Sequence, residues 1–541
     1  MKVLGITHPY SYNNAACLII DGKLIAFAEE ERFIRYKHAP HIAASQATQF
    51  CLDKAGIKKD DLDYIAVGLD DWYKTILPNL IGQSPKFAIS KIRRNIRWLR
   101  LLRWQQPFDF KDPRVVNVNH HMAHIASSFY LSGFEKSNII SWDGAGESEA
   151  GMIGYGEQNK INVLHRITNQ GSWGALYEEV TKKLGFRKHS QEGKTMGLAS
   201  FGRPDPELFD FIDWQARPIP KINWHKRNEF LSKIKGRPRG EEFTQDHKDL
   251  AATLQYCLEK AGFMIVDYLY SQTGNKNLCL AGGVALNCAM NGKFLESPQV
   301  DNIFIQPASS DAGTALGAAA LVYTQKKGCR PDFVFDHAYW GPEFSNQEIE
   351  ETLKECKVSK YHKSDNIFKE TAQKLSENKI VGWFQGRMEI GPRALGCRSI
   401  LANPSLAKMK DEVNNNVKKR ESWRPFAPSV LEEHAKHYVE NYHKSPFMIL
   451  AFKIKPEKKD QLIAATHVDD TVRLQSVSKK TNLPYWNLIN EFRKISGVPG
   501  LLNTSYNLAG EPVVCTPRDA VRTFYGSGLD CLAIGDYLIE K

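Results

Sequence analysis

The chain has 541 residues, of which 42% are hydrophobic and 25% charged, so it is long enough for about two to four domains of an ordinary soluble protein. Its net charge of +11 favours anionic partners, which include nucleotides, phosphates, nucleic acid and membrane surfaces. The ten cysteines include no Cys-x-x-Cys pair, which argues against a disulfide framework or a thiolate zinc site and favours a cytoplasmic location.

The first 30 residues predict a strand, a polar loop and a hairpin. Residues 2–7 and 15–20 have the apolar pattern of strands, and Asp21-Gly22 is a strong signal for a two-residue turn before the strand at residues 23–30. The run at residues 1–6 is too short for a signal peptide, and no uninterrupted apolar segment approaches the roughly 20 residues that span a bilayer. We therefore expect no membrane contact through a spanning helix.

A basic segment follows at residues 91–104. It contains five arginines, with apolar residues at helical spacing, and is typical of a basic amphipathic helix. Such a helix could contact RNA, a membrane or an acidic partner, or simply pack its apolar stripe while its charges are solvated.

His120 and His124 are spaced so that both imidazoles lie on one face of a helix. Asp143 follows a predicted strand in a glycine-rich loop, and Asp311 lies in a second such loop further along the chain. Two imidazoles and two carboxylates suit Fe, Mn or Zn better than Ca. We predict a metal site from these four residues, with His121 facing away.

The strand pattern of the N-terminus recurs between residues 138 and 167, where a strand, a small or polar loop, a strand, a turn and a strand follow one another. This repetition predicts a duplicated α/β domain with two lobes on either side of a cleft. The strand at residues 278–280 then enters a loop with Gly282 and Gly283, where the backbone can approach a nucleotide closely.

Residues 326–342 are rich in Lys, Gly and Pro and predict an interdomain connection. A helix at residues 367–378 and a strand at 380–384 then begin a second domain. Residues 381–430 hold nine Lys or Arg against four Asp or Glu, interleaved with Gly and Pro. Turns allow guanidinium groups and backbone N–H groups to converge on one small anion, so this window predicts a site for a phosphate-type substrate.

Taken together, ordered motifs along almost the whole chain resemble the O-carbamoyltransferase family of NodU, CmcH and TobZ. They lie at residues 29–32, 37–38, 120–124, 143–144, 192–197, 282–287, 311–313, 386–399, 418–426, 503–505 and 510–512.

The resemblance implies an α/β fold in two parts. Residues 1–345 would form an actin-like (ASKHA) domain similar to TsaD, which transfers the carbamoyl group and holds metal and nucleotide. Residues 346–541 would form a YrdC-like domain that makes carbamoyl adenylate from carbamoyl phosphate and ATP. The carbamoyl group would then move to a hydroxyl of a small molecule, which would be a natural product or a sugar, in the biosynthesis of an antibiotic or another secondary metabolite.

The resemblance also assigns site residues. Carbamoyl phosphate would be bound by a cationic set with one hydroxyl, in which Lys418 and Arg424 are catalytic: Arg393, Lys418, Arg424, Arg473 and Ser505. The nucleotide, ATP with Mg, would contact Lys194, Gly282, Gly283, Asn287 and Asp311. The metal would be Fe(II), with Mn or Zn as alternatives, on His120, His124, Asp143 and Asp311.

One departure concerns the first loop, where many relatives carry a histidine. This chain has Tyr12 there, so either Tyr12, His38 or His8 would act on the acceptor hydroxyl in its place, or the acceptor would bind differently.

Two other functions are open from the sequence. A tRNA-modifying enzyme of the threonylcarbamoyl type would fit the two halves and the net charge, but the arginine cluster is compact and lacks a long basic stripe with stacking aromatics, so we do not expect nucleic acid. A non-catalytic nucleotide-binding scaffold is the third possibility. The expected partners are carbamoyl phosphate, ATP and an alcohol acceptor, and a homodimer remains open.

Overall fold

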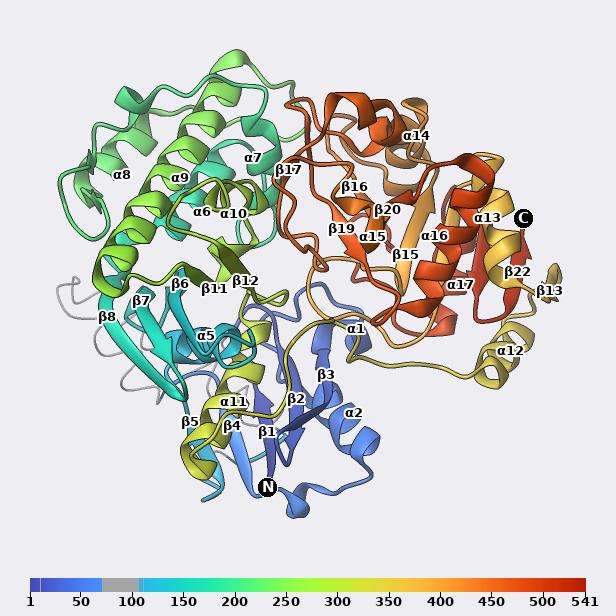
Figure 1. Ribbon diagram of the computed structural model, residues 1–541, viewed down its shortest axis with the longest axis horizontal. Helices are drawn as coiled ribbons and strands as arrows, with labels where there is room; N and C mark the ends of the chain where they lie inside the picture. The colour runs from blue at the N-terminus through green and yellow to red at the C-terminus, as the bar shows by residue number, and fades with distance from the viewer. Residues whose placement is uncertain (10, 71–106, 110) are drawn as a thin grey trace. The chain divides into compact units, whose positions relative to one another are not determined.

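A computed structural model of the protein describes residues 1–9, 11–70, 107–109 and 111–541. Contacts within the chain divide it into two units (Figure 1). The first unit comprises Met1–Glu30 and His38–Phe335, and the second comprises Glu31–Lys37 and Asp336–Lys541.

The first unit contains two five-stranded sheets with the same strand order. The first sheet has the order β3-β2-β1-β4-β5 and the second the order β8-β7-β6-β11-β12. In each sheet the first three strands along the chain are antiparallel neighbours, and the last two are parallel to the first strand of the set. The strands are β1 (Lys2–Ile6), β2 (Ala15–Ile20), β3 (Lys23–Glu29), β4 (Tyr64–Val67), β5 (Val115–Asn117), β6 (Lys136–Gly146), β7 (Glu149–Glu157), β8 (Lys160–Thr168), β11 (Asn277–Ala281) and β12 (Asn302–Ile305). The predicted duplication is therefore confirmed.

The strand boundaries follow the local sequence closely. The turn between β2 and β3 has positive φ at Asp21 (+46°) and Gly22 (+82°), as a tight two-residue hairpin requires. β6 differs from the prediction, because it continues through the expected loop to Gly146, which pairs with Glu149 after an irregularity in register. The strands β4, β5 and β12 have only three or four residues each, too few for a clear alternating pattern in the sequence.

Two equivalent helices pack against each other in the first unit (Figure 1). α5 (His120–Phe129) follows β5, and α11 (Ala312–Lys327) follows β12. A Cβ added at Gly317 of α11 would lie 1.7 Å from the carbonyl oxygen of Ala123, so only glycine allows this close approach. The packing brings α5 and α11 into direct contact. His120 is the first residue of α5, and Asp311 immediately precedes α11.

α2 (Ser45–Ala55) packs on β2 and β3 of the first sheet. The second sheet and its connections are accompanied by further described helices: α6 (Trp173–Lys183), α7 (Glu192–Ala199), α8 (Trp224–Lys233), α9 (Gln245–Thr273) and α10 (Cys288–Phe294), with the short strands β9 (Ile212–Asp213) and β10 (Lys221–Ile222). α9 begins where the side chain of Thr244 caps it and ends at Gly274, whose φ is +63°.

The second unit is built on an eight-stranded mixed sheet of order β13-β22-β21-β14-β15-β20-β16-β19. The central strands β14 and β15 are buried along their whole length, although β15 begins with the polar residues Arg398 and Ser399. The strands are β13 (Tyr361–Lys363), β14 (Val381–Phe384), β15 (Arg398–Ala402), β16 (Ala427–Leu431), β19 (Gln475–Val477), β20 (Gly500–Ser505), β21 (Cys531–Ile534) and β22 (Tyr537–Glu540), with a separate pair, β17 (Phe452–Lys453) and β18 (Thr471–Val472).

The helices of this unit are α12 (Asn346–Glu355), α13 (Ile367–Ser376), α14 (Lys408–Glu412), α15 (Glu432–Ala435), α16 (Leu483–Ser496) and α17 (Pro517–Tyr525). α13 and β14 lie where the sequence predicts the first helix and strand of a second domain. The predicted fold class, two α/β parts of which the first is duplicated, is confirmed.

A short N-terminal segment belongs to the second unit. It starts within α1 (Glu30–Ile34), and its arginines are anchored by backbone carbonyl groups and by carboxylates. Arg32 donates to the carbonyl oxygen of Gly391 at 2.8 Å, and Arg35 donates to that of Pro512 at 3.0 Å and lies 3.4 Å from Asp519. The charged motif at residues 29–32 therefore has a structural role in joining distant parts of the sequence.

The predicted basic helix at residues 91–104 lies outside the described residues. Within the part of the chain that the structure describes, every helix is too short or too polar to cross a membrane.

Candidate active site

Two histidines lie on one face of the first turns of α5. The side chain of Asn119 caps this helix by accepting a backbone hydrogen bond. Because residues four apart are one turn apart, His120 and His124 are neighbours, and their Nε2 atoms lie 3.1 Å from each other. Both rings are buried. His121 has different contacts, since its Nδ1 forms a 2.9 Å hydrogen bond with Ser141 Oγ.

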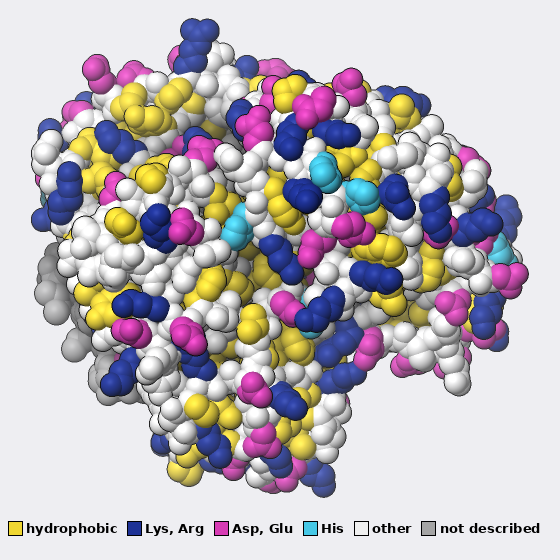
Figure 2. All heavy atoms as spheres, in the orientation of Figure 1, with side chains coloured by type: hydrophobic (Ala, Val, Ile, Leu, Met, Phe, Trp, Pro, Cys, Tyr) yellow, Lys and Arg dark blue, Asp and Glu magenta, His cyan; other side chains and the backbone are white. Residues whose placement is uncertain are grey.

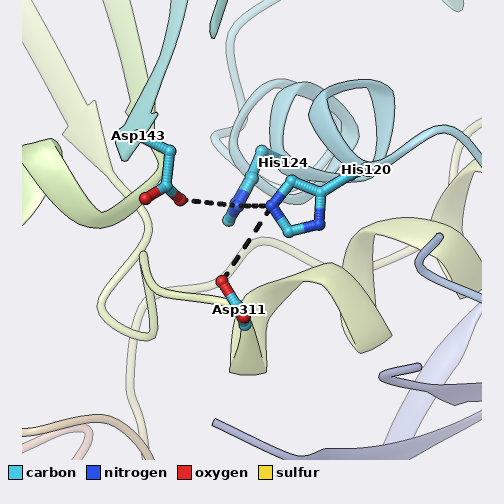
Figure 3. Close-up of side chains that lie close together, drawn as sticks. All are labelled: His120, His124, Asp143 and Asp311. Atoms are coloured by element: carbon cyan, nitrogen blue, oxygen red, sulfur yellow. Dashed lines mark hydrogen bonds and ion pairs between the residues drawn. The ribbon is translucent and has the colours of Figure 1, made fainter. Parts of the chain in front are cut away.

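Two aspartates complete the set of donors (Figure 3). His124 Nε2 lies 3.2 Å from Asp143 Oδ2, and His120 Nε2 lies 3.9 Å from Asp311 Oδ1. One ligand atom from each of the four side chains lies within 4.8 Å of the others. The four side chains come from α5, β6 and the start of α11, which is why the duplicated fold brings them together.

Backbone N–H groups orient both carboxylates. Gly144 donates to Asp143 Oδ1 at 2.6 Å, and Gly283 donates to Asp143 Oδ2 at 3.0 Å. Tyr12 donates its backbone N–H to Asp311 Oδ2 at 2.7 Å, which leaves Oδ1 on the side of His120. Carboxylates held in this way are typical of metal sites, where surrounding hydrogen bonds fix the ligands.

The protonation states also suit a metal ion. Burial lowers the pKa of His124 and so favours the neutral imidazole. Burial opposes ionisation of Asp143, but the hydrogen bond from His124 and the nearby imidazoles outweigh it, so the pKa of Asp143 lies below its ordinary value. Neutral imidazole and ionised carboxylate are the forms that bind metals, and two nitrogens with two oxygens suit Fe, Mn or Zn. The residues therefore fit a bound transition-metal ion.

The glycine loop after β11 is tied to the same place. Gly282 has φ +88°, and an added Cβ would lie 2.3 Å from the carbonyl oxygen of Trp142, the residue before Asp143. Gly283 follows it and holds the carboxylate of Asp143. The sequence therefore needs glycine at position 282 so that this loop can lie against the end of β6.

We expect Gly282→Ala to lower the stability of the protein by about 2 kcal/mol or more, because a side chain at this φ is strained and collides with β6. A thermal unfolding curve would measure the change. Gly236→Ala is the matched control, since an added Cβ there comes no closer than 3.7 Å to its nearest neighbour, the carbonyl oxygen of Lys183. Equal melting temperatures for the two variants would contradict the requirement for glycine at position 282.

Two other predicted nucleotide ligands make contacts of a different kind. Asn287 caps α10, and its Nδ2 donates to Gln255 Oε1 at 2.8 Å. Lys194 lies half-buried on α7, with its ammonium 5.2 Å from the centre of the Phe186 ring. Asp311, by contrast, lies at the donor set itself.

Tyr12 and His38, the predicted substitutes for a first-loop histidine, lie together beside Asp311. Their ring centres are 5.1 Å apart, and the Tyr12 backbone holds the Asp311 carboxylate. His38 Nδ1 forms a 2.8 Å hydrogen bond with Asn13 Oδ1. A further histidine, His189, lies on Tyr12 with ring centres 5.2 Å apart, and sequence reasoning missed it because it lies just before the motif at residues 192–197 and not within it.

In the second unit, Lys418 is buried at the end of one turn of π-helix, Val413–Lys418. Its ammonium donates to Ser505 O at 2.8 Å, Asn507 O at 3.0 Å and Asn507 Oδ1 at 2.7 Å, and Ser505 Oγ lies 3.3 Å away. The structure thus brings the predicted pair Lys418 and Ser505 together from positions 87 residues apart. These four acceptors are neutral, so the charge of Lys418 is solvated by dipoles but not neutralised by them.

Several cations lie close enough to perturb one another. Burial, and then the charges of Arg420, Arg424 and Lys37, hold the pKa of Lys418 well below its usual range. Burial, and then Arg424 and Arg473, do the same to the pKa of Arg420. Shifts in this direction mean that burial and mutual repulsion disfavour the charged forms. A bound anion would relieve both effects.

The arginines are held in different ways. Arg420, which was not predicted as a site residue, donates from Nε to Asn414 Oδ1 at 2.7 Å. Arg424 lies 3.9 Å from Glu421, the carboxylate that opposes the repulsion at both Arg420 and Arg424. Arg473 Nε is buried and has no hydrogen-bond partner among the described residues. Arg420 and Arg473 therefore share the environment of Lys418 and Arg424.

The loop between β14 and β15 carries Arg393, which is half-buried. Glu389 shapes this loop, because its Oε1 accepts backbone hydrogen bonds from Leu395 at 2.7 Å and from Cys397 and Arg398 at 3.2 Å. A buried carboxylate with three such donors fixes the backbone around Arg393.

Comparison with known proteins defines the class to which this fold and donor set belong. The family model described as "Carbamoyltransferase N-terminus" matches residues 2–320, and "Carbamoyltransferase C-terminus" matches residues 372–541. The chain therefore belongs to the carbamoyltransferase family, and the predicted family and enzyme class are confirmed.

Two nodulation proteins are among the relatives that match most of the chain. The nodulation protein NolNO of Sinorhizobium fredii is 40% identical, with 99% of this chain and 80% of the relative covered. The nodulation protein NolO of Bradyrhizobium diazoefficiens is 42% identical, with 78% of this chain and 79% of the relative covered. Among solved structures, full-length HypF in its phosphate- and nucleotide-bound form has 14% identity and a TM-score of 0.37 over 60% of this chain and 56% of HypF. A similarity of that size carries no conclusion about activity.

Proposed function

We propose that this carbamoyltransferase uses carbamoyl phosphate and ATP with Mg to form carbamoyl adenylate, and transfers the carbamoyl group to a hydroxyl of a small molecule. The observation that carries the proposal is the group of mutually repelling cations around Lys418. Carbamoyl phosphate is a compact dianion, and several cations with a hydroxyl bind such an ion well.

Within this proposal, residues 346–541 make the adenylate. Lys418 and Arg424 stabilise the charge that develops on the phosphate oxygens, and Arg473, Arg393 and Ser505 hold the substrate in place. The ammonium of Lys418 is already held in position by Ser505 and Asn507 before the anion enters.

Residues 1–345 transfer the carbamoyl group. A transition-metal ion, Fe(II) or else Mn or Zn, would be held by four ligands and would supply a Lewis acid: His120, His124, Asp143 and Asp311. The backbone N–H groups of Gly283 and Tyr12 orient the two carboxylates. Tyr12 and His38 lie beside Asp311, where an acceptor hydroxyl would need a hydrogen-bond partner.

A direct assay tests the proposal. Pyrophosphate should be released from ATP only when carbamoyl phosphate is present, and mass spectrometry should detect an added carbamoyl group on a hydroxyl compound. Candidate acceptors are aminoglycosides, other sugars, polyketides, alkaloids and β-lactam alcohols. Pyrophosphate release that does not depend on carbamoyl phosphate would contradict the proposed donor.

One face of the protein bears on the choice between small anions and nucleic acid. On the face that Figure 2 presents, Lys and Arg side chains alternate with Asp and Glu and form no continuous basic stripe. A steep salt dependence of tRNA binding would instead support the tRNA-modifying alternative.

We expect the purified protein to bind about one transition-metal ion, and His124→Ala to lose it, because His124 lies at the centre of the donor set. Elemental analysis after removal of loosely bound metal would measure the content. His225→Ala, at an exposed histidine of α8, is the control and should keep the ion. Unchanged metal content in His124→Ala would contradict the ligand assignment.

A further inference from the structure

A histidine and a glutamate outside the predicted site residues form a paired group. His189 Nδ1 lies 2.8 Å from Glu178 Oε1, with 42% of the histidine side chain and 20% of the glutamate exposed. Glu178 lies on α6, and His189 lies in the turn between α6 and α7 with φ +62°. A carboxylate at Nδ1 selects the tautomer with the proton on that nitrogen, so the lone pair is on Nε2.

The pair contacts the turn that carries Asp143 and the first loop, whose backbone holds Asp311. The His189 ring centre lies 5.2 Å from that of Tyr12, whose backbone N–H holds Asp311. A Cβ added at Gly144, the residue after Asp143, would lie 2.9 Å from Glu178 Oε1, so Glu178 packs directly on that turn. Two independent contacts therefore put the pair next to the place where transfer is proposed.

We propose that His189 is the general base that deprotonates the acceptor hydroxyl, with Glu178 as the residue that positions it; this rests on the proposed function above. The hydroxyl proton moves to His189 Nε2 as the hydroxyl oxygen attacks the carbamoyl carbon of carbamoyl adenylate. A new C–O bond forms, the bond from the carbamoyl carbon to the phosphate oxygen breaks, and AMP leaves with the electron pair. His189 then returns its proton to solvent.

His189 is better equipped for this step than His38. The Nδ1 of His38 pairs with the neutral amide oxygen of Asn13, which stabilises a positive imidazolium less than a carboxylate does. The Nδ1 of His189 pairs with Glu178, as in the histidine–carboxylate arrangements of acyl-transfer enzymes. His189 thus takes the role for which the first loop, with Tyr12, has no imidazole.

The electrostatic environment of His189 determines whether carbamoyl transfer increases or decreases with pH. The hydrogen bond with Glu178 raises the pKa of His189 most, burial opposes it, the charges of Glu178 and Glu192 raise it, and that of Lys188 lowers it. Tyr12, a phenol, is the other group packed on the ring. Because the base must be unprotonated, transfer should increase as pH increases through the raised pKa of His189.

The first test is single-turnover kinetics of His189→Gln, with glucose as the probe acceptor and water as the competing one. Release of pyrophosphate reports adenylate formation, and release of AMP reports loss of the carbamoyl group to either acceptor. We expect pyrophosphate release at the wild-type rate and AMP release slowed by about 100-fold or more, with partial rescue by added imidazole. His225→Gln, at an exposed histidine of the same unit, should resemble the wild type.

If His189→Gln released AMP at the wild-type rate, or lost both half-reactions, His189 would not be the general base. Absence of carbamoyl phosphate-dependent pyrophosphate release in the wild type would refute the proposed function instead, so the two failures are distinguishable.

The second test is Glu178→Gln, which keeps the shape of the side chain and removes its charge. We expect the pKa of His189, followed by NMR of labelled histidine, to fall, and the acid limb of the AMP-release profile to move to lower pH with it. A merely structural role for the pair would leave that limb in place. The proposal would be overturned if neither the acid limb of the AMP-release profile nor the pKa of His189 changed in this variant.

Discussion

Lys418→Ala should abolish the formation of carbamoyl adenylate. Its ammonium makes charge-assisted hydrogen bonds to Ser505 and Asn507 within a group of cations that a dianion would stabilise. Loss of a charged contact of this kind in a closed site costs about 3 kcal/mol, which is about 100-fold in rate. Pyrophosphate release with carbamoyl phosphate and ATP measures the effect.

Two further variants separate catalysis from folding. Lys419→Ala changes the exposed neighbour and should retain near wild-type activity. Arg424→Ala should be nearly as inactive as Lys418→Ala, yet its side chain is 30% exposed and pairs only at 3.9 Å with Glu421, so the fold should tolerate its loss. Near wild-type turnover of carbamoyl phosphate in either Lys418→Ala or Arg424→Ala would mean that the site is elsewhere.

Local sequence signals predicted the first unit well. The Asp21-Gly22 turn, the paired histidines and the two loops with aspartates each depend on neighbours within a few residues. The duplication explains why residues that are predicted from separate local signals come together in one site. α5 and α11 are equivalent helices of the two repeats, so the residues at their starts, His120 and Asp311, meet when the helices pack.

Contacts between distant segments were less predictable. Lys418 is held by residues 87 and 89 positions further along, and nothing in its own neighbourhood specifies Asn507. The pairing of His189 with Glu178 depends on the turn after α6, whose course follows from tertiary packing and not from a motif. The resemblance to a family predicted both Lys418 and Ser505 as site residues, whereas no residue pattern predicted His189.

The loss of metal ligands should uncouple the two half-reactions. His120→Ala and Asp311→Ala should still make carbamoyl adenylate, because the cations around Lys418 are all in the second unit. Both should fail to carbamoylate an acceptor, by more than about 100-fold, because the donor set of the first unit is broken. Pyrophosphate would then be released without carbamoylated product, as the adenylate accumulates or hydrolyses.

Supplied carbamoyl adenylate makes the division of labour testable in both directions. Lys418→Ala cannot make the intermediate but keeps the intact donor set of the first unit, so added adenylate should restore transfer. His120→Ala and Asp311→Ala already make the intermediate, so the same addition should not help them, and His225→Ala should transfer with or without it. Rescue of the metal-ligand variants together with failure to rescue Lys418→Ala would reverse the roles assigned to the two units.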